Sequence, residues 1–130
     1  MVSFEHFVIQ GGSPIYAQLV RHIKRGIAAG SITDQDEMPS RRVLSALLGV
    51  NPNTVQKAYR LLEEEHLLES HLGTKSYITV SEAQVQAIRV QLVKGEILEL
   101  ANALKQMGVP CREAVELLRQ LWGQGEEGEE

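Results

Sequence analysis

The sequence contains a single cysteine, Cys111, and no apolar run as long as the roughly 18 residues that a membrane-spanning helix needs. One cysteine cannot form a disulfide within the chain. The first residues, MVSFEHFVIQGGSP, lack the basic segment followed by an apolar core that a secretory signal requires. We therefore expect a cytoplasmic protein without a membrane partner.

Residue patterns typical of catalytic or metal-binding sites are also missing. The sequence shows no pairing of a nucleophile with a base, no paired carboxylates and no phosphate-binding glycine loop. The spacings of its four histidines match no compact metal motif: His6, His22, His66 and His71. We expect neither an enzyme nor a bound cofactor or metal, and we interpret Cys111 as a small, semi-buried core or interface residue.

Acids are absent from one segment of an otherwise acidic chain. The net charge is −4, and residues 81–130 carry all of this excess, because acids and bases balance in residues 1–80. Between Met38 and Leu62 there is no Asp or Glu, and the charged residues are Arg41, Arg42, Lys57 and Arg60. A local basic patch on an acidic protein indicates a docking surface for a particular polyanion.

The N-terminal 40 residues predict an arm, a helix and a loop. Residues 1–13 show no clear period and are expected to form a short strand or arm. A helix is predicted between Pro14, which suits a first turn, and Gly30, which suits an end. Its apolar residues recur every four positions, with Tyr16 and Val20 beside them: Ile15, Leu19, Ile23 and Ile27. The segment SITDQDEMPS is predicted to be a loop.

Two further helices are predicted on either side of the short sequence GVN. Ser40 is the candidate N-cap of the first, which stops at Gly49. Asn51 is the candidate N-cap of the second, which has Pro52 at its first position and runs to about His66. The second helix has opposite apolar and polar stripes with the same spacing: Val55, Ala58, Tyr59 and Leu62 against Asn53, Gln56, Lys57 and Arg60.

The rest of the chain predicts a hairpin and two helices. The sequence LLESHLGTKSYITV indicates strands at residues 67–70 and 76–80 around a tip that contains Gly73. Ser81 and Gln84 form a capping box that opens a long helix, which continues to about Met107. A last helix is predicted from about Pro110 to Trp122. The glycine- and glutamate-rich residues 123–130 are expected to form a disordered acidic tail.

Two helices joined by a tight turn, followed by a hairpin, describe a winged helix-turn-helix. Asn53 and Gln56 can pair bidentately with adenine in the major groove, and Lys57 and Arg60 are expected to contact phosphate. Other candidate DNA contacts lie at the helix starts and at the hairpin tip: Arg41, Arg42, Asn51, Thr54 and Lys75. The alternatives are that the stripe is a solvated helix face and that Lys75 is only an exposed loop lysine.

The segment MPSRRVLSALLGVNPNTVQKAYRLLEEEHLLES resembles the winged helix-turn-helix of GntR-type bacterial transcription regulators, and PIYAQLVRHIKRGIAAGSI resembles the helix before it. The short, helical C-terminal part is similar to the YtrA subfamily, which implies a dimeric repressor that is often encoded beside ABC-transporter genes. Relatives usually have a glycine near Asp36, which this chain lacks. The resemblance places five residues at DNA-contacting positions: Arg42, Asn51, Asn53, Thr54 and Gly73.

The expected fold class is therefore mostly α with a small β-hairpin wing. A winged helix-turn-helix in residues 1–80 precedes a two-helix dimerisation element in residues 81–122. The apolar residues assigned to the dimer interface are Val85, Ile88, Leu92, Ile97, Leu100, Leu104, Leu118 and Trp122. The alternative is that these side chains pack back onto their own winged helix.

The expected function is that of a sequence-specific, homodimeric repressor of transcription that binds an inverted-repeat operator. Its expected partners are double-stranded DNA and a second copy of the chain. The other class of function that fits the sequence is a winged-helix module that binds an acidic protein. Neither the operator nor an effector is indicated by the sequence.

Overall fold

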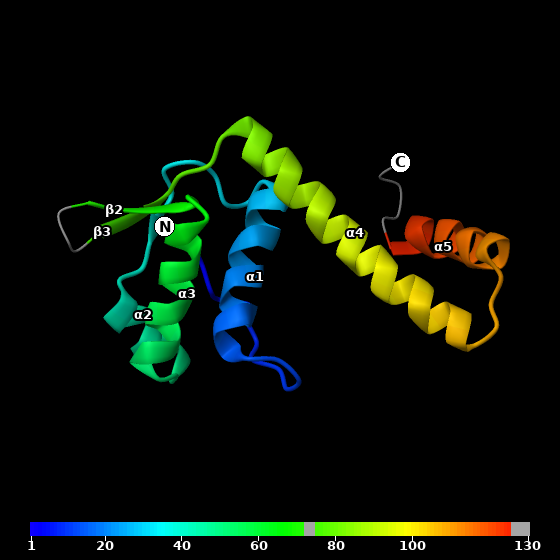
Figure 1. Cartoon of the computed structure of the whole chain (residues 1–130), viewed down its shortest axis with the longest axis horizontal. Helices are drawn as coiled ribbons and strands as arrows, with labels where there is room; N and C mark the ends of the chain where they lie inside the picture. Colours follow the sequence, from blue (N-terminus) through cyan, green and yellow to red (C-terminus); the bar gives the residue numbers. More distant parts are fainter. Residues whose placement is uncertain (72–74, 126–130) are drawn as a thin grey trace. The chain divides into compact units, whose positions relative to one another are not determined.

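The computed structural model describes residues 1–71 and 75–125 of the chain. The chain divides into two compact units, one of residues 1–92 and one whose described part is residues 93–125 (Figure 1). The first unit contains α1 (Ile15–Ala29), β1 (Glu37–Met38), α2 (Arg41–Leu48), α3 (Pro52–Glu64), β2 (Leu68–His71), β3 (Lys75–Ile78) and the start of α4 (Glu82–Gln106). The second contains the rest of α4 and α5 (Cys111–Gly125).

The first unit has one core, which the apolar stripes of its helices share. Leu19, Ile23 and Ile27 of α1 pack with the buried stripe of α3, as the spacing of the apolar residues predicts. Leu44 of α2 and Ile78 of β3 complete the centre of this core, and both have no measurable exposure. The expected fold class, a winged helix-turn-helix with further helices after it, is confirmed.

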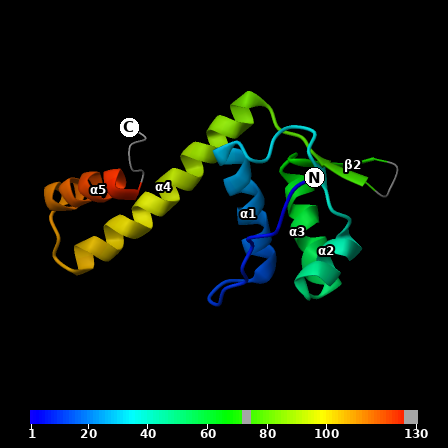
Figure 2. The same cartoon turned by 180° about the vertical axis from the view of Figure 1, so that it is seen from behind.

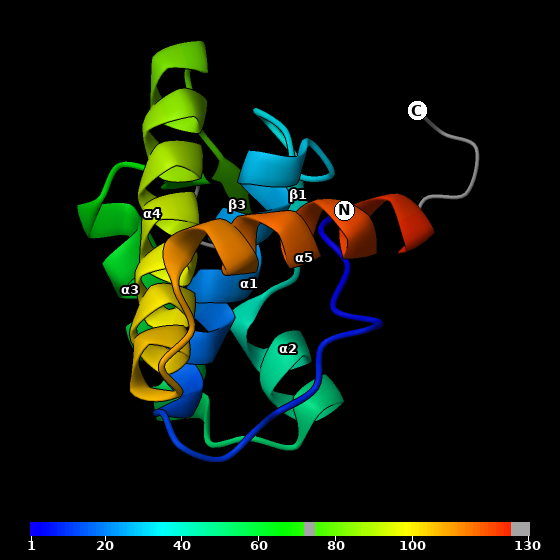
Figure 3. The ribbon, with the colours of Figure 1, turned by 90° about the vertical axis from the view of Figure 1, so that its right-hand side faces the viewer.

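The sheet has three antiparallel strands in the order β1-β3-β2. Figure 3 labels the neighbouring strands β1 and β3. The hairpin of β2 and β3 was expected, with ends that differ by one or two residues. The prediction of a loop at residues 31–40 is wrong at β1, where Glu37 pairs with Tyr77 and Met38 with Ser76. A strand of two residues has no period of its own, so only its partner strand reveals it.

The N-terminal arm forms no strand, but it is part of the core. It runs along α1 (Figure 2), and the Val2 N–H donates to the carbonyl oxygen of Glu37 at 2.8 Å. Val2 and Phe4 are both buried. The His22 ring of α1 lies against Phe4, with 4.7 Å between the two ring centroids.

Among residues 1–71 and 75–92, two residues other than glycine adopt left-handed backbone angles. Gln35 has a φ of 73° and His66 a φ of 62°. Side chains with a Cβ are disfavoured at such angles, so both positions store strain.

The long helix α4 begins with the expected capping box. The Ser81 N–H donates to Gln84 Oε1 at 2.8 Å, and the Gln84 N–H donates to Ser81 Oγ at 3.1 Å. Ile88 is 8% exposed in the core of the first unit, and Val85 and Leu92 pack beside it. In the single chain these three residues pack against the core of their own winged helix, as the alternative interpretation expected, and Val85 and Leu92 stay half-buried. Their assignment to a dimer interface stays a prediction.

In the second unit, α5 is longer than the sequence indicated. It continues through Gly125, so the expected disorder is wrong for residues 123–125, whereas residues 126–130 lie outside the described part. Cys111 is exposed, not semi-buried. Within the parts of the chain that the structure describes, no helix is both long enough and apolar enough to cross a membrane.

Candidate nucleic-acid interface

Side chains of the chain itself hold the turn between α2 and α3. The hydroxyl of Ser45, a buried residue, donates to the Val50 carbonyl oxygen at 2.6 Å. Asn51 Oδ1 accepts the Asn53 N–H at 2.7 Å, which confirms Asn51 as the N-cap of α3. Gly49 ends α2 with a φ of 68°, a left-handed angle that suits glycine. The first turn of α3 is thus fixed relative to α2.

The side of α3 that faces away from the core is polar and open. Asn53, Gln56 and Arg60 are exposed, and Thr54 is half-buried. The Arg60 Nε lies 3.9 Å from Glu64 Oε2, but more than half of each side chain is in solvent, so this ion pair is weak. The predicted polar stripe therefore presents two amides and a guanidinium to any partner.

Lys57, the remaining base of this stripe, lies against an aromatic ring. Its ammonium nitrogen is 4.0 Å from the centroid of the Tyr16 ring in the first turn of α1. Such a cation–π contact restrains a flexible lysine without removing its charge. Tyr16 was placed only beside the apolar stripe of its helix, and the sequence contains no signal that pairs it with Lys57.

The two arginines at the start of α2 differ in their surroundings. Arg42 is exposed, as expected of a DNA contact. Arg41 turns toward α3, where its guanidinium carbon lies 4.8 Å from the centroid of the Tyr59 ring. Its Nη2 lies 3.5 Å from Glu63 Oε2. The assignment of Arg41 to DNA binding stays a prediction, and the structure gives this side chain protein partners.

Tyr59 anchors this region within the core. Its hydroxyl donates to the Pro39 carbonyl oxygen, just before the N-cap of α2. Burial raises the pKa of the Tyr59 hydroxyl above its ordinary value, and the nearby Arg41 charge offsets part of that rise. The hydroxyl therefore stays protonated and keeps donating to the carbonyl oxygen.

The wing is described up to its tip. Lys75 is exposed and opposes His71 in the ladder between β2 and β3. Gly73, the other predicted wing residue, lies outside the described residues. Lys75 is therefore the described lysine or arginine that lies closest to the tip of the hairpin.

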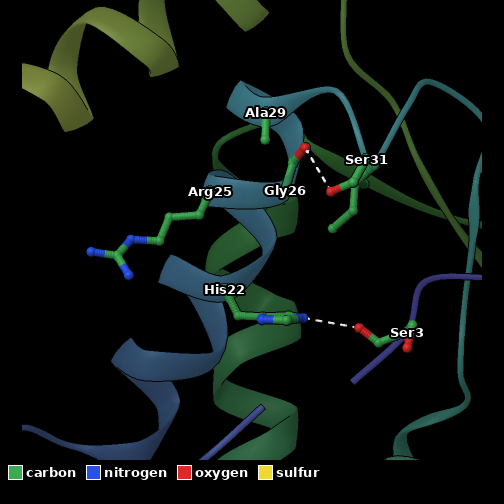
Figure 4. Close-up of a pocket in the computed structure, with 7 residues that line it drawn as sticks. Ser3, His22, Arg25, Gly26, Ala29 and Ser31 are labelled. Atoms are coloured by element: carbon green, nitrogen blue, oxygen red, sulfur yellow. Dashed lines mark hydrogen bonds between the residues drawn. The ribbon is translucent and has the colours of Figure 1, made fainter. Parts of the chain in front are cut away.

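A cavity of about 340 Å³ lies on another side of α1 and has no part in the polar stripe (Figure 4). Two of its polar side chains are paired within it: His22 Nε2 lies 2.9 Å from the Ser3 carbonyl oxygen, and the Ser31 hydroxyl donates to the Gly26 carbonyl oxygen at 3.4 Å. Arg25 points away from His22 in Figure 4. No group of three or more side chains that could hold a metal occurs in residues 1–71 and 75–125.

A fixed turn, an open polar stripe and an adjoining hairpin define the class of a DNA-binding winged helix-turn-helix domain. Residues 15–78 match the family described as bacterial regulatory proteins, gntR family. The chain is 33% identical over 98 residues to the HTH-type transcriptional repressor YtrA of Bacillus subtilis, with 75% of this chain and 71% of the relative covered. The chain belongs to the GntR family, and the relatives that it matches are transcription regulators and not enzymes.

Solved structures agree with this assignment. A GntR family transcriptional regulator from Listeria monocytogenes superposes with a TM-score of 0.77 and 26% identity, over 86% of this chain and 98% of that one. The DNA-binding domain of AraR, in complex with operator ORX1, superposes with a TM-score of 0.50 and 28% identity, over 55% of this chain and 93% of that one. The second structure has DNA bound to a related domain.

Proposed function

We propose that this chain is a sequence-specific repressor of transcription that acts in the cytoplasm and binds an inverted-repeat operator as a homodimer. The observation that carries the proposal is the open stripe of α3, whose amides suit base edges. In this proposal Asn53 and Gln56 read bases, while Arg42, Lys57 and Arg60 contact phosphate. Thr54 and the capped N-terminus of α3 add uncharged phosphate contacts.

The proposed dimer interface is a seam of exposed apolar side chains on α4. From Val93 onward these residues are separated alternately by four and three positions: Val93, Ile97, Leu100 and Leu104, followed by Met107 directly after the end of the helix. All but the half-buried Leu104 are about half exposed or more. Alternating spacings of four and three are the seam pattern of packed helix pairs, so this stripe suits a second helix.

The seam and the inward-facing residues occupy different sides of α4. At about 100° per residue, Val85, Ile88 and Leu92 lie about a third of a turn away from the centre of the seam. α4 therefore serves two surfaces, the core of its own winged helix and the proposed partner. A second copy is the proposed occupant because two-fold dimers are the commonest assembly.

Exposed apolar side chains on α5 extend the proposed interface. Leu118 and Trp122, which are 46% and 61% exposed, belonged to the predicted interface and remain in this proposal. Leu117 and Leu121 beside them are also exposed. An exposed tryptophan with three leucines is an unusual surface for a monomer, because large apolar patches commonly mark interaction sites.

Adjacent leucine and isoleucine residues provide a matched test of the dimer. Ile97 lies on the seam, whereas Leu98 is exposed on another side of the same helix. Ile97→Asp should weaken self-association at least about tenfold, because a charge would be buried without a partner. Leu98→Asp should leave it unchanged. Sedimentation equilibrium measures both, and equal effects of the two changes would reject the seam.

Footprinting on DNA upstream of the gene, with full-length protein, tests operator binding. The footprint should cover two inverted half-sites whose centres lie about one helical turn, or a multiple of it, apart. Asn53→Ala should cost about 1–3 kcal/mol on this site and much less on unrelated duplex. Binding to an acidic protein, without binding to duplex DNA, would favour a protein-interaction module instead.

The YtrA resemblance suggests that the regulated genes encode an ABC transporter. Deleting the gene should then raise the transcript level of a transporter operon that contains the footprinted site. Measuring transcripts in the deletion strain and in a strain with Asn53→Ala separates repression through DNA from indirect effects. Lower transcript levels of that operon in both strains would indicate an activator.

A further inference from the structure

Three elements of the first unit meet at one carboxylate oxygen, Glu63 Oε2. Glu63 lies near the end of α3, Arg41 in the first turn of α2, and Ser70 in β2. Arg41 Nη2 lies 3.5 Å from this oxygen, and the Ser70 hydroxyl donates to it at 2.9 Å. One side chain of the recognition helix thus connects the start of α2 with a strand of the wing.

The other side of Arg41 lies against an aromatic ring, and 31% of the Arg41 side chain remains exposed. Its guanidinium lies over the ring of Tyr59, which is 1% exposed and anchored to the Pro39 carbonyl oxygen. The Arg41 Nε is buried and has no hydrogen-bond partner among the described residues. A guanidinium held between a ring and a carboxylate is oriented by the protein before any partner arrives.

Ser70 carries this connection to the wing. Its hydroxyl lies 3.3 Å from that of Ser76, its partner across the ladder, and Ser76 is nearly buried. The next pair toward the tip is His71 with Lys75. A bond that fixes Ser70 therefore also restrains the strand ends from which Lys75 projects.

We propose that Arg41, Glu63 and Ser70 position the wing for DNA, and that Arg41 acts through Glu63 instead of contacting the nucleic acid. This inference rests on the proposed DNA-binding function. The hydrogen bond from Ser70 to a carboxylate is charge-assisted and stronger than a neutral one. Without it, the outer end of the β2–β3 ladder, at the pair His71–Lys75 beyond the residues of β3 that pair with β1, has one bond fewer to orient it.

The test measures binding of the full-length chain to non-specific duplex DNA over a series of salt concentrations. Ser70→Ala removes the bond to Glu63 without changing any charge and should weaken binding about threefold. Ser70→Thr keeps a hydroxyl and should bind like the unchanged chain. Ser31→Ala is the matched control. The Ser31 hydroxyl also forms a hydrogen bond within the protein, but Ser31 follows α1 and belongs to neither strand of the wing.

A double-mutant cycle with Lys75 identifies the route of the effect. Lys75→Ala should lower the salt slope by about one unit. With Lys75 already replaced, Ser70→Ala and Arg41→Met should each cost less than about half of their effect alone, because coupled residues are not additive. Asn53→Ala should cost the same in both backgrounds, since it does not act through the wing.

Three results would overturn the inference. In one, Ser70→Ala binds DNA as tightly as the unchanged chain. In another, the effects of Arg41→Met and Lys75→Ala add fully, and each lowers the salt slope by about one unit, which indicates a direct phosphate contact by Arg41. In the third, Lys75→Ala changes nothing. If the unchanged chain fails to bind duplex at all, the proposed DNA-binding function itself is wrong.

Discussion

The two units differ in where their apolar side chains lie. In Met1–Leu92 the apolar stripes of four helices converge on one core, and residues such as Ile23 are 1% exposed. In Val93–Glu130 comparable side chains remain open, and Ile97 is 57% exposed. The same residue type therefore stabilises the first unit from within, whereas in the second unit it lies exposed on the surface of the single chain. An apolar period identifies a buried face, but it does not say which chain buries that face.

Isoleucine-to-alanine changes in the two units should give the sharpest contrast. Ile23→Ala should lower the free energy of unfolding by about 2–5 kcal/mol at every protein concentration, because it leaves a cavity. Ile97→Ala should cost less than about 0.5 kcal/mol in dilute protein and more as the concentration rises, because association stabilises the folded state. Urea unfolding at several concentrations measures both. A concentration-independent loss for Ile97→Ala would mean that its own chain covers it.

Two truncations should locate the end of the first unit. A chain that ends at Leu92 should fold as a monomer with a complete core. A chain that ends at Val80 lacks Ile88, and it should be less stable by about 1.5–3 kcal/mol, the usual contribution of one buried isoleucine. Thermal unfolding followed by circular dichroism measures the difference. Equal stability would show that the start of α4 adds nothing to the winged helix.

A glycine at His66 should stabilise the first unit. The φ of 62° at this position disfavours a Cβ, so His66→Gly should raise the free energy of unfolding by about 0.5–1 kcal/mol. Glu65→Gly, at a φ of −89°, is the matched control and should not stabilise. Chemical denaturation compares the two. A loss of stability from His66→Gly would mean that contacts of the imidazole outweigh the backbone strain.

Of the changes considered, loss of the contact between Tyr16 of α1 and Lys57 of α3 should have the smallest effect, and it should be seen in DNA affinity. Tyr16→Leu removes the ring under Lys57 and should weaken binding to duplex DNA by about 0.5–1 kcal/mol, whereas Tyr16→Phe keeps the ring and should have little effect. Each affinity is measured again with Lys57→Met, which should abolish the difference between the two tyrosine variants. If Tyr16→Phe binds as weakly as Tyr16→Leu, the hydroxyl, and not the ring, is what matters.

Local signals in the sequence predicted much of the first unit and little of its cross-connections. Asn51 and the Ser81–Gln84 pair were identified because caps depend on residues one to three positions apart. The short strand β1 was missed because it depends on β3, about 40 residues away in the chain. Arg41 was grouped with Arg42 because a charge count cannot show which arginine turns toward Glu63.

The two faces of α4 show the same limit for packing. The predicted dimer interface included both Val85 and Ile97, which are about 120° apart around the helix axis. Apolar residues occur on both faces of α4, so the sequence pattern does not show which face is buried in the winged helix. Only the position of the winged-helix core shows that Val85 packs inward and that Ile97 does not.

The internal hydrogen bonds of Ser45 and Asn51 also bear on the thermodynamics of binding. They order the helix-turn-helix during folding, so DNA association does not have to supply the entropy cost of ordering this turn. The heat-capacity change on binding should then match the surface that is buried against the duplex. It should not reach the larger value seen when a segment folds as it binds. Such a pre-organised reader should associate at a rate set by diffusion and electrostatic steering.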